Sequence, residues 1–189
     1  MEYAFKMFNQ DLTWTKGRGK FQYHENEWME EEEANCIRNG FHCAKNPLDC
    51  LSYYPDWDSS VCYVVEIGGD IDEDAWDSKI SCTKIRLVHP LTLSQFVAHS
   101  LWYIMQHPLM PDNVNVKADR ATAGRNHFAI ARGKDPAAKG KLGDAIGILK
   151  EKPESREIEA AGSYRIDGIK YLPDVWYDVE GRPRTDEES

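Results

Sequence analysis

The segment from Gly40 to Tyr54 contains the residue types that most often carry chemistry. His42 is adjacent to Cys43, and Cys50 follows in the same segment, so a thiol nucleophile with an imidazole base is one hypothesis. Adjacent residues of a strand point to opposite faces, which places His42 and Cys43 poorly for proton exchange. A free cysteine is more often a small buried hydrophobe. We therefore expect these thiols to have a structural role.

A second group of reactive side chains is acidic and follows the pair Gly68-Gly69. A loop of carboxylates led by glycine suggests calcium binding, but the spacing does not match the twelve-residue calcium loop. The five cysteines form no C-x-x-C pair and no histidine lies at metal-ligand spacing, so we expect no metal site. The alternative is that the loop docks on a basic protein surface. The candidate contact residues are Asp70, Asp72 and Asp74.

The elements that must position these side chains are mostly strands in the first hundred residues. Alternating or β-branched patterns predict strands at 3–8, 20–23, 61–67 and 79–88. Asn46 followed by Pro47 predicts a helix start, and Thr92 with Gln95 forms a capping box before an apolar helix that ends at Pro108. The acidic run before residue 37 predicts a further short helix. We expect an α+β fold with a twisted, mainly antiparallel sheet and two or three helices.

The composition changes after Pro111, where alanine and glycine recur at short intervals. Small residues at regular spacing let backbones stack closely, which predicts a short β-solenoid-like or hairpin tail. A flexible linker is the alternative. The predicted organisation is an α+β domain over residues 1–111 and a small-residue repeat with C-terminal strands over residues 112–189. Open ends of stacked coils would allow homo-oligomers to form through this tail.

The bulk composition excludes several classes of function. The chain has 189 residues, with 41% apolar and 29% charged side chains, and a formal net charge of −9. A chain this acidic is a poor binder of phosphate backbones, so we do not expect direct contact with nucleic acid. There is no apolar run of membrane-spanning length and no signal peptide pattern. We expect a cytoplasmic protein with reduced thiols and no contact with a membrane.

Three motifs carry a resemblance to a family of phage and prophage proteins of unassigned function. The run Gly40-Phe41-His42, then Asn46-Pro-Leu-Asp49, then Tyr53-Tyr54 resembles the family signature. The alanine- and glycine-rich stretch and the closing Asp-Gly and Pro-Asp-Val-Trp-Tyr segments are similar to the rest of the family pattern. The resemblance covers nearly the whole chain. It implies a phage-encoded protein located in the host cytoplasm, and it implies no particular activity.

The same segment is distantly similar to ADP-ribosyltransferases, which bind NAD between an aromatic-bearing strand and a later unit that contains tyrosine. That resemblance implies catalytic candidates His42, Tyr53, Tyr54 and Glu66, with the carboxylate polarising a ribose hydroxyl in the transition state. NAD would be the cofactor in that case, and otherwise we expect none. The alternative is that the aromatic rings are core packing.

The first functional hypothesis is an accessory protein that acts by binding a host protein or a nucleotide-like ligand, and that inhibits a host defence system. The second is an NAD-dependent transferase, and the third is a self-assembling structural protein. No spaced catalytic constellation is evident, so we favour a binder over an enzyme. Beside the acidic loop, the candidate binding residues are Phe41, Asn46, Asp49 and Trp102.

Overall fold

The computed structural model describes residues 2–14, 19–35, 39–73 and 78–185. The chain divides into two compact units, Met1–Leu91 and Thr92–Ser189, so the division falls before the expected boundary at residue 111. Strands make up 50% of the structure and helices 12%. The predicted α+β class with two or three helices is therefore wrong, and the fold is mostly β. The main reason is that two strands run for 14 and 12 residues where shorter strands and a loop were expected.

The first unit is a small barrel-like sheet with one short 3-10 helix. Its elements, in chain order, are β1 (Glu2–Asn9), β2 (Thr13–Trp14), β3 (Phe21–Gln22), β4 (Trp28–Glu30), β5 (Phe41–Ala44), η1 (Pro47–Ser52), β6 (Ser60–Glu73) and β7 (Lys79–Pro90).

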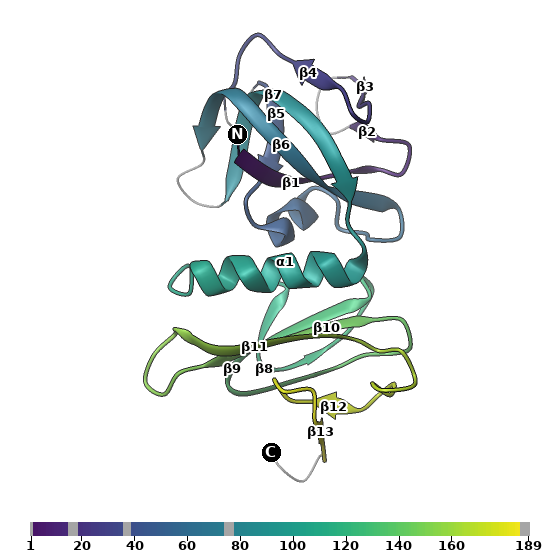
Figure 1. Ribbon diagram of the computed structural model, residues 1–189, viewed down its shortest axis with the longest axis vertical. Helices are drawn as coiled ribbons and strands as arrows, with labels where there is room; N and C mark the ends of the chain where they lie inside the picture. Colours follow the sequence, from purple (N-terminus) through teal and green to yellow (C-terminus); the bar gives the residue numbers. More distant parts are fainter. Residues whose placement is uncertain (1, 15–18, 36–38, 74–77, 186–189) are drawn as a thin grey trace. The chain divides into compact units, whose positions relative to one another are not determined.

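Four strands of the first unit pair in a ring rather than in an open sheet. Strand β1 pairs with β5 and β6, and β7 pairs with the same two strands, always antiparallel. The ring closes because the long strands β6 and β7 bend, with register shifts at Val64/Val65 and between Gly68 and Ile71. Figure 1 shows these two strands curving together over β1 and β5. Closure gives the unit an interior that side chains from every strand must fill.

The interior of the ring is packed with aromatic and aliphatic side chains. The rings of Phe8 and Tyr23 meet edge to face with centroids 4.7 Å apart, and Phe8 meets Tyr63 in the same way at 5.9 Å. The buried cluster consists of Ala4, Phe8, Tyr23, Phe41, Cys43, Tyr63, Val65, Ile67, Ile80, Cys82, Ile85 and Leu87.

Two acidic segments of this unit form strands where the sequence predicted a helix and a loop. The acidic segment before residue 37 forms no helix in its described part, because Trp28–Glu30 pairs with β7 instead. The acidic stretch after Gly69 begins as strand, since β6 continues to Glu73, and the backbone N–H of Asp70 donates to Thr83 Oγ1 at 2.9 Å. Pairing with a long partner strand outweighs the loop preference of these acidic residues.

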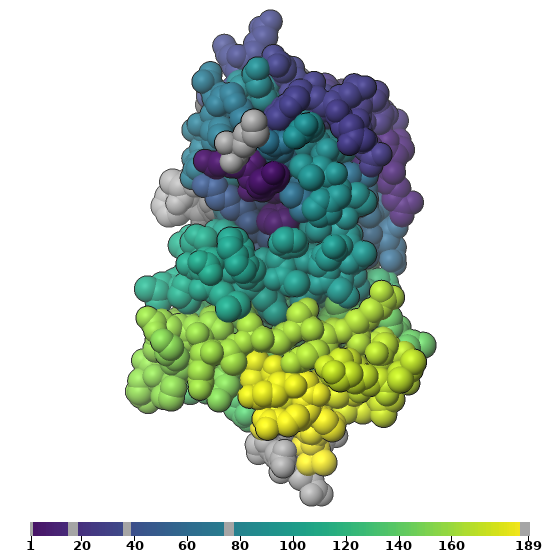
Figure 2. All heavy atoms as spheres, in the orientation of Figure 1, coloured from purple at the N-terminus to yellow at the C-terminus, as the bar shows by residue number. Residues whose placement is uncertain are grey.

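The second unit combines one α-helix with a six-stranded sheet. Strands β8, β9 and β10 are parallel neighbours, β11 pairs antiparallel with β10, and β12 pairs antiparallel with β9 through Tyr177 and Ala138. Figure 2 shows the C-terminal residues, in yellow, packed directly on the yellow-green residues of the same unit. The elements are α1 (Leu93–Gln106), β8 (Val116–Thr122), β9 (Phe128–Lys139), β10 (Ala145–Glu151), β11 (Ile158–Arg165), β12 (Trp176–Tyr177) and β13 (Pro183–Arg184).

Helix α1 starts as the sequence predicts but packs within the second unit. Thr92 Oγ1 accepts from the backbone N–H of Gln95, whose side chain accepts from the backbone N–H of Thr92. The helix lies on β10, where Gly147 leaves room for Val97 and Leu101. A Cβ at Gly147 would lie 2.9 Å from atoms of both side chains. The helix therefore belongs with the C-terminal sheet, although the sequence placed it in the first domain.

The alanine- and glycine-rich stretch forms strands, so the linker alternative does not hold. Ala129 and Ala131 of β9 face Ile146 and Ile148 of β10 in one buried cluster. The pair Asp167-Gly168 is a common hairpin signal, but no hairpin forms there, because β11 and β12 do not pair with each other. Asp167 Oδ1 instead accepts three backbone N–H groups, at 2.8 to 3.0 Å, and forms a local turn. Among the described residues, no helix is long and apolar enough to span a bilayer.

Candidate functional site

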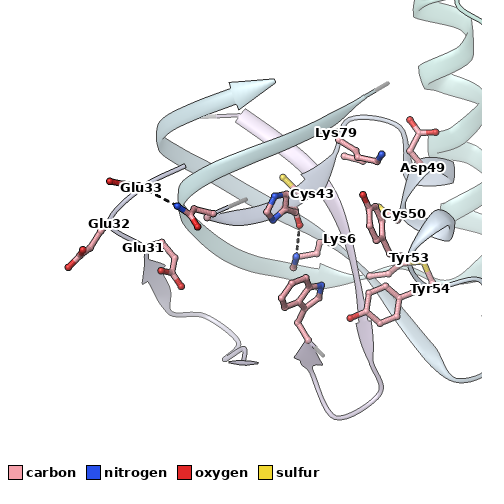
Figure 3. A pocket seen from close by; sticks show the side chains of 16 residues that line it. Lys6, Glu31, Glu32, Glu33, Cys43, Asp49, Cys50, Tyr53, Tyr54 and Lys79 are labelled. Carbon is pink, nitrogen blue, oxygen red and sulfur yellow. Dashed lines mark hydrogen bonds between the residues drawn. The ribbon is translucent and has the colours of Figure 1, made fainter. Parts of the chain in front are cut away.

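The first unit contains a pocket of about 860 Å³. Its walls come from β1, β2, β5, η1, the start of β7 and the segment that precedes β5 (Figure 3). The lining residues are Lys6, Met7, Trp14, Glu31, Glu32, Glu33, Asn39, Gly40, His42, Cys43, Ala44, Asp49, Cys50, Tyr53, Tyr54 and Lys79.

Lys6 lines the pocket and is almost wholly buried, with 4% of its surface exposed. It lies between Ala4 and Phe8 on β1, and strand alternation directs all three side chains to the same face. The Lys6 Nζ lies 5.3 to 5.8 Å from the ring centroids of Phe8, Trp14 and Tyr23. Aromatic faces at this distance attract a cation.

The electrostatic surroundings of Lys6 contain few compensating charges. Its Nζ donates a hydrogen bond to the backbone carbonyl oxygen of His42, a contact drawn in Figure 3. Among the described residues, it forms no ion pair with a carboxylate. Burial lowers the pKa of Lys6 from its ordinary value, and the nearby thiols of Cys43, Cys50 and Cys82 oppose this effect. The amine is therefore more readily deprotonated than a surface lysine.

Helix η1 is fixed at the pocket wall by its first residues, as Asn46 and Pro47 predict. Asn46 Oδ1 accepts from the backbone N–H of Leu48 at 3.1 Å, which caps the helix. Asp49 Oδ2 accepts from Ser78 Oγ at 2.5 Å, and this bond ties the helix to the residue before β7. Asn46 is thus a structural cap, while Asp49 both anchors the helix and lines the pocket.

The two tyrosines that follow η1 differ in their exposure. Tyr54 is buried with 5% of its surface exposed, whereas Tyr53 is 43% exposed at the pocket wall. The Lys79 Nζ lies 5.3 Å from the Tyr53 ring centroid, so a cation sits beside an accessible aromatic ring. Figure 3 shows Lys79 and Tyr53 on the same side of the pocket.

His42 lines the pocket and is partly buried, so the structure brings it together with Tyr53 and Tyr54. Burial lowers the pKa of His42, and the positive charges of Lys6 and Lys79 lower it further, against a hydrogen bond to the Gly40 backbone that raises it. The imidazole is therefore neutral at pH 7, when one ring nitrogen donates and the other accepts.

The thiols of the pocket are poor nucleophiles, as the sequence predicts. A hydrogen bond to Cys82 and burial raise the pKa of Cys43 well above its ordinary value. Burial raises the pKa of Cys50 to about 12. A thiol must lose its proton to attack, so these two groups are inert at neutral pH.

The pocket is chemically polarised along its length. Figure 3 shows Glu31, Glu32 and Glu33 on one side of Lys6, and Tyr53 and Lys79 on the other. Carboxylates accept hydrogen bonds from N–H groups, while a lysine attracts an anion. The pocket therefore suits a ligand with hydrogen-bond donors at one end and a negative charge at the other.

Several predicted site residues lie elsewhere. Glu66 is buried, with 2% of its surface exposed, and its carboxylate accepts from Arg86 Nε at 3.1 Å and from a second nitrogen of that guanidinium. It does not line the pocket with His42 and the tyrosines. Phe41 is a core residue of the barrel, where its ring packs edge to face with Tyr23.

The remaining candidates do not form a site with the pocket residues. Asp70 and Asp72 are exposed on β6, and Asp74 lies outside the described residues. Trp102 belongs to the second unit, where 61% of its surface is exposed on α1. Within the described ranges, no group of three or more His, Cys, Asp or Glu side chains could hold a metal ion.

Sequence reasoning missed three important lining residues, which are Lys6, Trp14 and Lys79. A signal was present for Lys6, since it stands between Ala4 and Phe8 on the apolar face of an alternating strand. A lysine at an inward position is unusual enough to mark a functional candidate. Trp14 and Lys79 carry no comparable signal, because only the closure of the barrel brings them to the pocket.

A family model matches residues 3–99, which includes every residue that lines the pocket. The match covers the described strands of the first unit and the beginning of α1. No curated protein and no solved structure matches the chain. The matched model covers more than half of the 189 residues, and the chain therefore belongs to the family described as a domain of unknown function, DUF7666.

Proposed function

We propose that the protein acts by binding, and that the pocket of its first unit holds a nucleotide-like ligand. The observation that carries this proposal is the exposed ring of Tyr53 beside the Lys79 ammonium, in the wall of a pocket of about 860 Å³. A pocket of this size accommodates a ligand of mononucleotide dimensions. An accessible aromatic ring stacks on any nucleobase, because every base offers a π face.

Each end of the pocket has a complementary role in this proposal. Lys79 pairs with a phosphate group, and the neutral imidazole of His42 donates a hydrogen bond to the same part of the ligand. The carboxylates of Glu31, Glu32 and Glu33 accept from the N–H groups of a base or sugar at the other end. The negative charges of these carboxylates repel a polyphosphate chain, so a ligand with a single phosphate fits better than a triphosphate.

The resemblance to phage proteins adds a biological hypothesis to this chemistry. The motif residues His42, Tyr53 and Tyr54 all line the pocket, so the signature segment supplies one of its walls. A phage protein that binds a nucleotide-like signal in the host cytoplasm would remove that signal from a defence system. This role is our proposal, and nucleotide binding is its first requirement.

The transferase alternative receives no support from the placement of Glu66. A catalytic carboxylate must lie within hydrogen-bond reach of the ribose hydroxyl it polarises. Glu66 is instead paired with Arg86 and is absent from the pocket lining. We therefore do not propose ADP-ribosyl transfer. Self-assembly through the C-terminal strands stays a prediction, which light scattering on the intact chain would test.

Isothermal titration calorimetry with AMP, GMP, CMP and UMP tests the proposed function. We expect at least one mononucleotide to bind the wild-type protein, and Tyr53→Ala to weaken that binding about 5- to 100-fold, which corresponds to a stacking energy of about 1–3 kcal/mol. Tyr3→Ala is the matched control, because Tyr3 is 65% exposed in the same unit and does not line the pocket. Binding by none of the four, or equal loss in both variants, would refute the proposal.

A further inference from the structure

The proposed binding mode leaves the most unusual group of the pocket unused. Lys6 is an inward-facing lysine in a barrel core, with 4% of its surface exposed, and it also lines the pocket. A buried lysine is normally paired with a carboxylate, and Lys6 has no such partner among the described residues. Its described polar contact is the donated hydrogen bond to the His42 carbonyl oxygen.

We propose that Lys6 is a reactive amine that forms a Schiff base with an aldehyde or ketone held in the pocket. The geometry that supports this proposal is the position of Lys6, which lines the pocket with its Nζ 5.8 Å from the ring centroid of Trp14 and 5.3 Å from that of Tyr23. These rings offer a flat, apolar surface on which a flat carbonyl compound can pack, and burial of Lys6 favours the neutral amine over the ammonium ion.

The reaction balances with the carbonyl compound as its only co-reactant. The lone pair of the neutral Nζ attacks the carbonyl carbon, a C–N bond forms, and the carbonyl oxygen takes a proton to give a carbinolamine. Loss of the second N–H proton and of the hydroxyl group as water leaves a C=N bond. Amine and carbonyl thus give imine and one water molecule, and no oxidant or reductant is needed.

The groups around Lys6 fit the protonation states that this reaction needs. Burial lowers the pKa of Lys6, so a larger share of this amine is neutral at pH 7 than for an exposed lysine. The neutral imidazole of His42 lines the same pocket and is a suitable proton carrier for the carbinolamine step. The thiols of Cys43 and Cys50 remain protonated and do not compete for the carbonyl compound.

Lys79 provides an internal comparison within the pocket. It is partly exposed, and its Nζ lies 5.3 Å from the Tyr53 ring centroid. Lys79 therefore attracts anions, while Lys6 is the nucleophile. This inference concerns the same pocket as the nucleotide proposal but does not depend on it, since one is read by reversible binding and the other by a covalent bond.

Reductive labelling of the wild-type protein tests the inference directly. The protein is incubated with benzaldehyde and sodium cyanoborohydride at several pH values between 6 and 9, and the labelled fraction of each lysine is measured by peptide mass spectrometry. At pH 7 we expect the labelled fraction of Lys6 to exceed that of Lys20 and Lys84, by about tenfold for each unit by which burial lowers its pKa. Both comparison lysines are exposed in the same unit.

The pH dependence separates a reactive amine from a structural one. We expect the labelling of Lys6 to level off at a lower pH than that of Lys20 and Lys84, because more of its amine is neutral at the start. In Lys79→Met, Lys6 should still be labelled, and in Lys6→Met the selective label should vanish while exposed lysines react as before. An unlabelled Lys6 in the folded wild-type protein, or labelling that rises with pH in parallel with the exposed lysines, would refute the inference even if mononucleotides bind.

Discussion

The Nζ of Lys6 on β1 donates a hydrogen bond to the backbone carbonyl oxygen of His42 on β5. These strands are antiparallel neighbours, with Phe5 opposite Ala44. The side chain thus satisfies a carbonyl group of the neighbouring strand from inside the barrel. The same contact holds the Lys6 amine away from water. Because burial changes the pKa of this amine, the stability of the barrel depends on pH.

Replacing Lys6 by methionine should change how stability depends on pH. The pKa of Lys6 is lower in the folded than in the unfolded protein, so the unfolded chain binds more protons between the two values. Wild-type stability therefore gains a contribution as pH rises through the folded pKa towards about 10.4, the ordinary lysine value. Lys6→Met lacks this contribution. The free energy of unfolding of Lys6→Met, relative to that of wild type, should therefore be higher at pH 7 than at pH 9.

Urea unfolding of both proteins at pH 7, 8 and 9 measures this effect. Each unit by which the pKa is lowered corresponds to about 1.4 kcal/mol in the free energy of unfolding. Deprotonation of Cys50 in the unfolded state lowers stability above about pH 9, because burial raises its folded pKa to about 12, so the comparison is made at pH 9 and below. A difference in free energy between the two proteins that stays constant from pH 7 to pH 9 would contradict the prediction.

Gly40, the residue before β5, should be intolerant of any side chain. Its φ of +86° is in the left-handed region, and a Cβ there would lie 2.6 Å from Ser81 Oγ and 2.9 Å from the Cys82 carbonyl oxygen. Gly40→Ala should cost about 1–2 kcal/mol for the backbone conformation and a further 1–3 kcal/mol for the clash. Thermal unfolding would measure the total loss.

Gly19→Ala is the matched control for the backbone contribution. Gly19 also has a positive φ, +97°, but nothing lies within 4 Å of its ideal Cβ position. This variant should show the conformational cost alone. Equal losses in the two variants would mean that crowding at β7 does not explain why the chain has glycine at position 40.

Local capping signals were predictable from the sequence because they depend on neighbouring residues only. Asn46 with Pro47 and Thr92 with Gln95 each specify a helix start through their own side-chain and backbone groups, and both starts are confirmed. The strands at 3–8, 61–67 and 79–88 were also predictable, since β-branched and alternating residues mark them.

The closure of the barrel was not predictable, because it depends on pairings between distant strands. Phe5 opposite Ala44 and Phe41 opposite Cys82 join segments about forty residues apart, and no local pattern encodes that register. The pocket forms only when the barrel closes. The segment from Gly40 to Tyr54 therefore identified one wall of the pocket, which includes Tyr53, but not the opposite wall. Glu66 was misplaced as a catalytic candidate because strand alternation alone does not tell which strands line the pocket, and no residue of β6 is among the lining residues.

The cap of η1 should affect ligand binding as well as stability. Asn46→Ala removes the acceptor for the Leu48 backbone N–H and should cost about 1 kcal/mol in the free energy of unfolding. Because η1 carries Tyr53, we also expect weaker binding of the mononucleotide identified by calorimetry. Thr92→Ala removes the corresponding cap of α1 in the second unit and should lower stability without changing that affinity. Equal affinities in both variants and wild type would show that η1 does not position the ring.

Trp102 should be a surface residue whose removal scarcely affects folding. The sequence marked it as a candidate binding residue, and 61% of it is exposed on α1. Trp102→Ala should change the free energy of unfolding by less than about 0.5 kcal/mol, as measured by urea unfolding of the intact chain. Phe96→Ala, on the buried face of the same helix, should cost about 3–5 kcal/mol. A loss above about 1.5 kcal/mol for Trp102→Ala would assign it to packing.

The ion pair between Glu66 and Arg86 should be asymmetric in its contribution to stability. The Glu66 side chain is 3% exposed, whereas Arg86 is 41% exposed and also lies 5.1 Å from the Trp28 ring centroid. Arg86→Met leaves a buried carboxylate without its charge partner and should cost about 1–3 kcal/mol. Glu66→Gln keeps the shape and a hydrogen-bond acceptor and should cost less.

A neighbouring pair on the same strand provides the control for this comparison. Lys84 pairs with Glu30 at 2.9 Å, and both side chains are about half exposed, so Lys84→Met should change stability by less than about 1 kcal/mol. Urea unfolding of the three variants gives the order Arg86→Met, Glu66→Gln, Lys84→Met in decreasing loss. In a binding assay, Glu66→Gln should retain wild-type affinity for the mononucleotide, because this carboxylate lies outside the pocket lining. A Glu66→Gln variant that folds normally but loses binding would instead place Glu66 at the ligand and revive the transferase hypothesis.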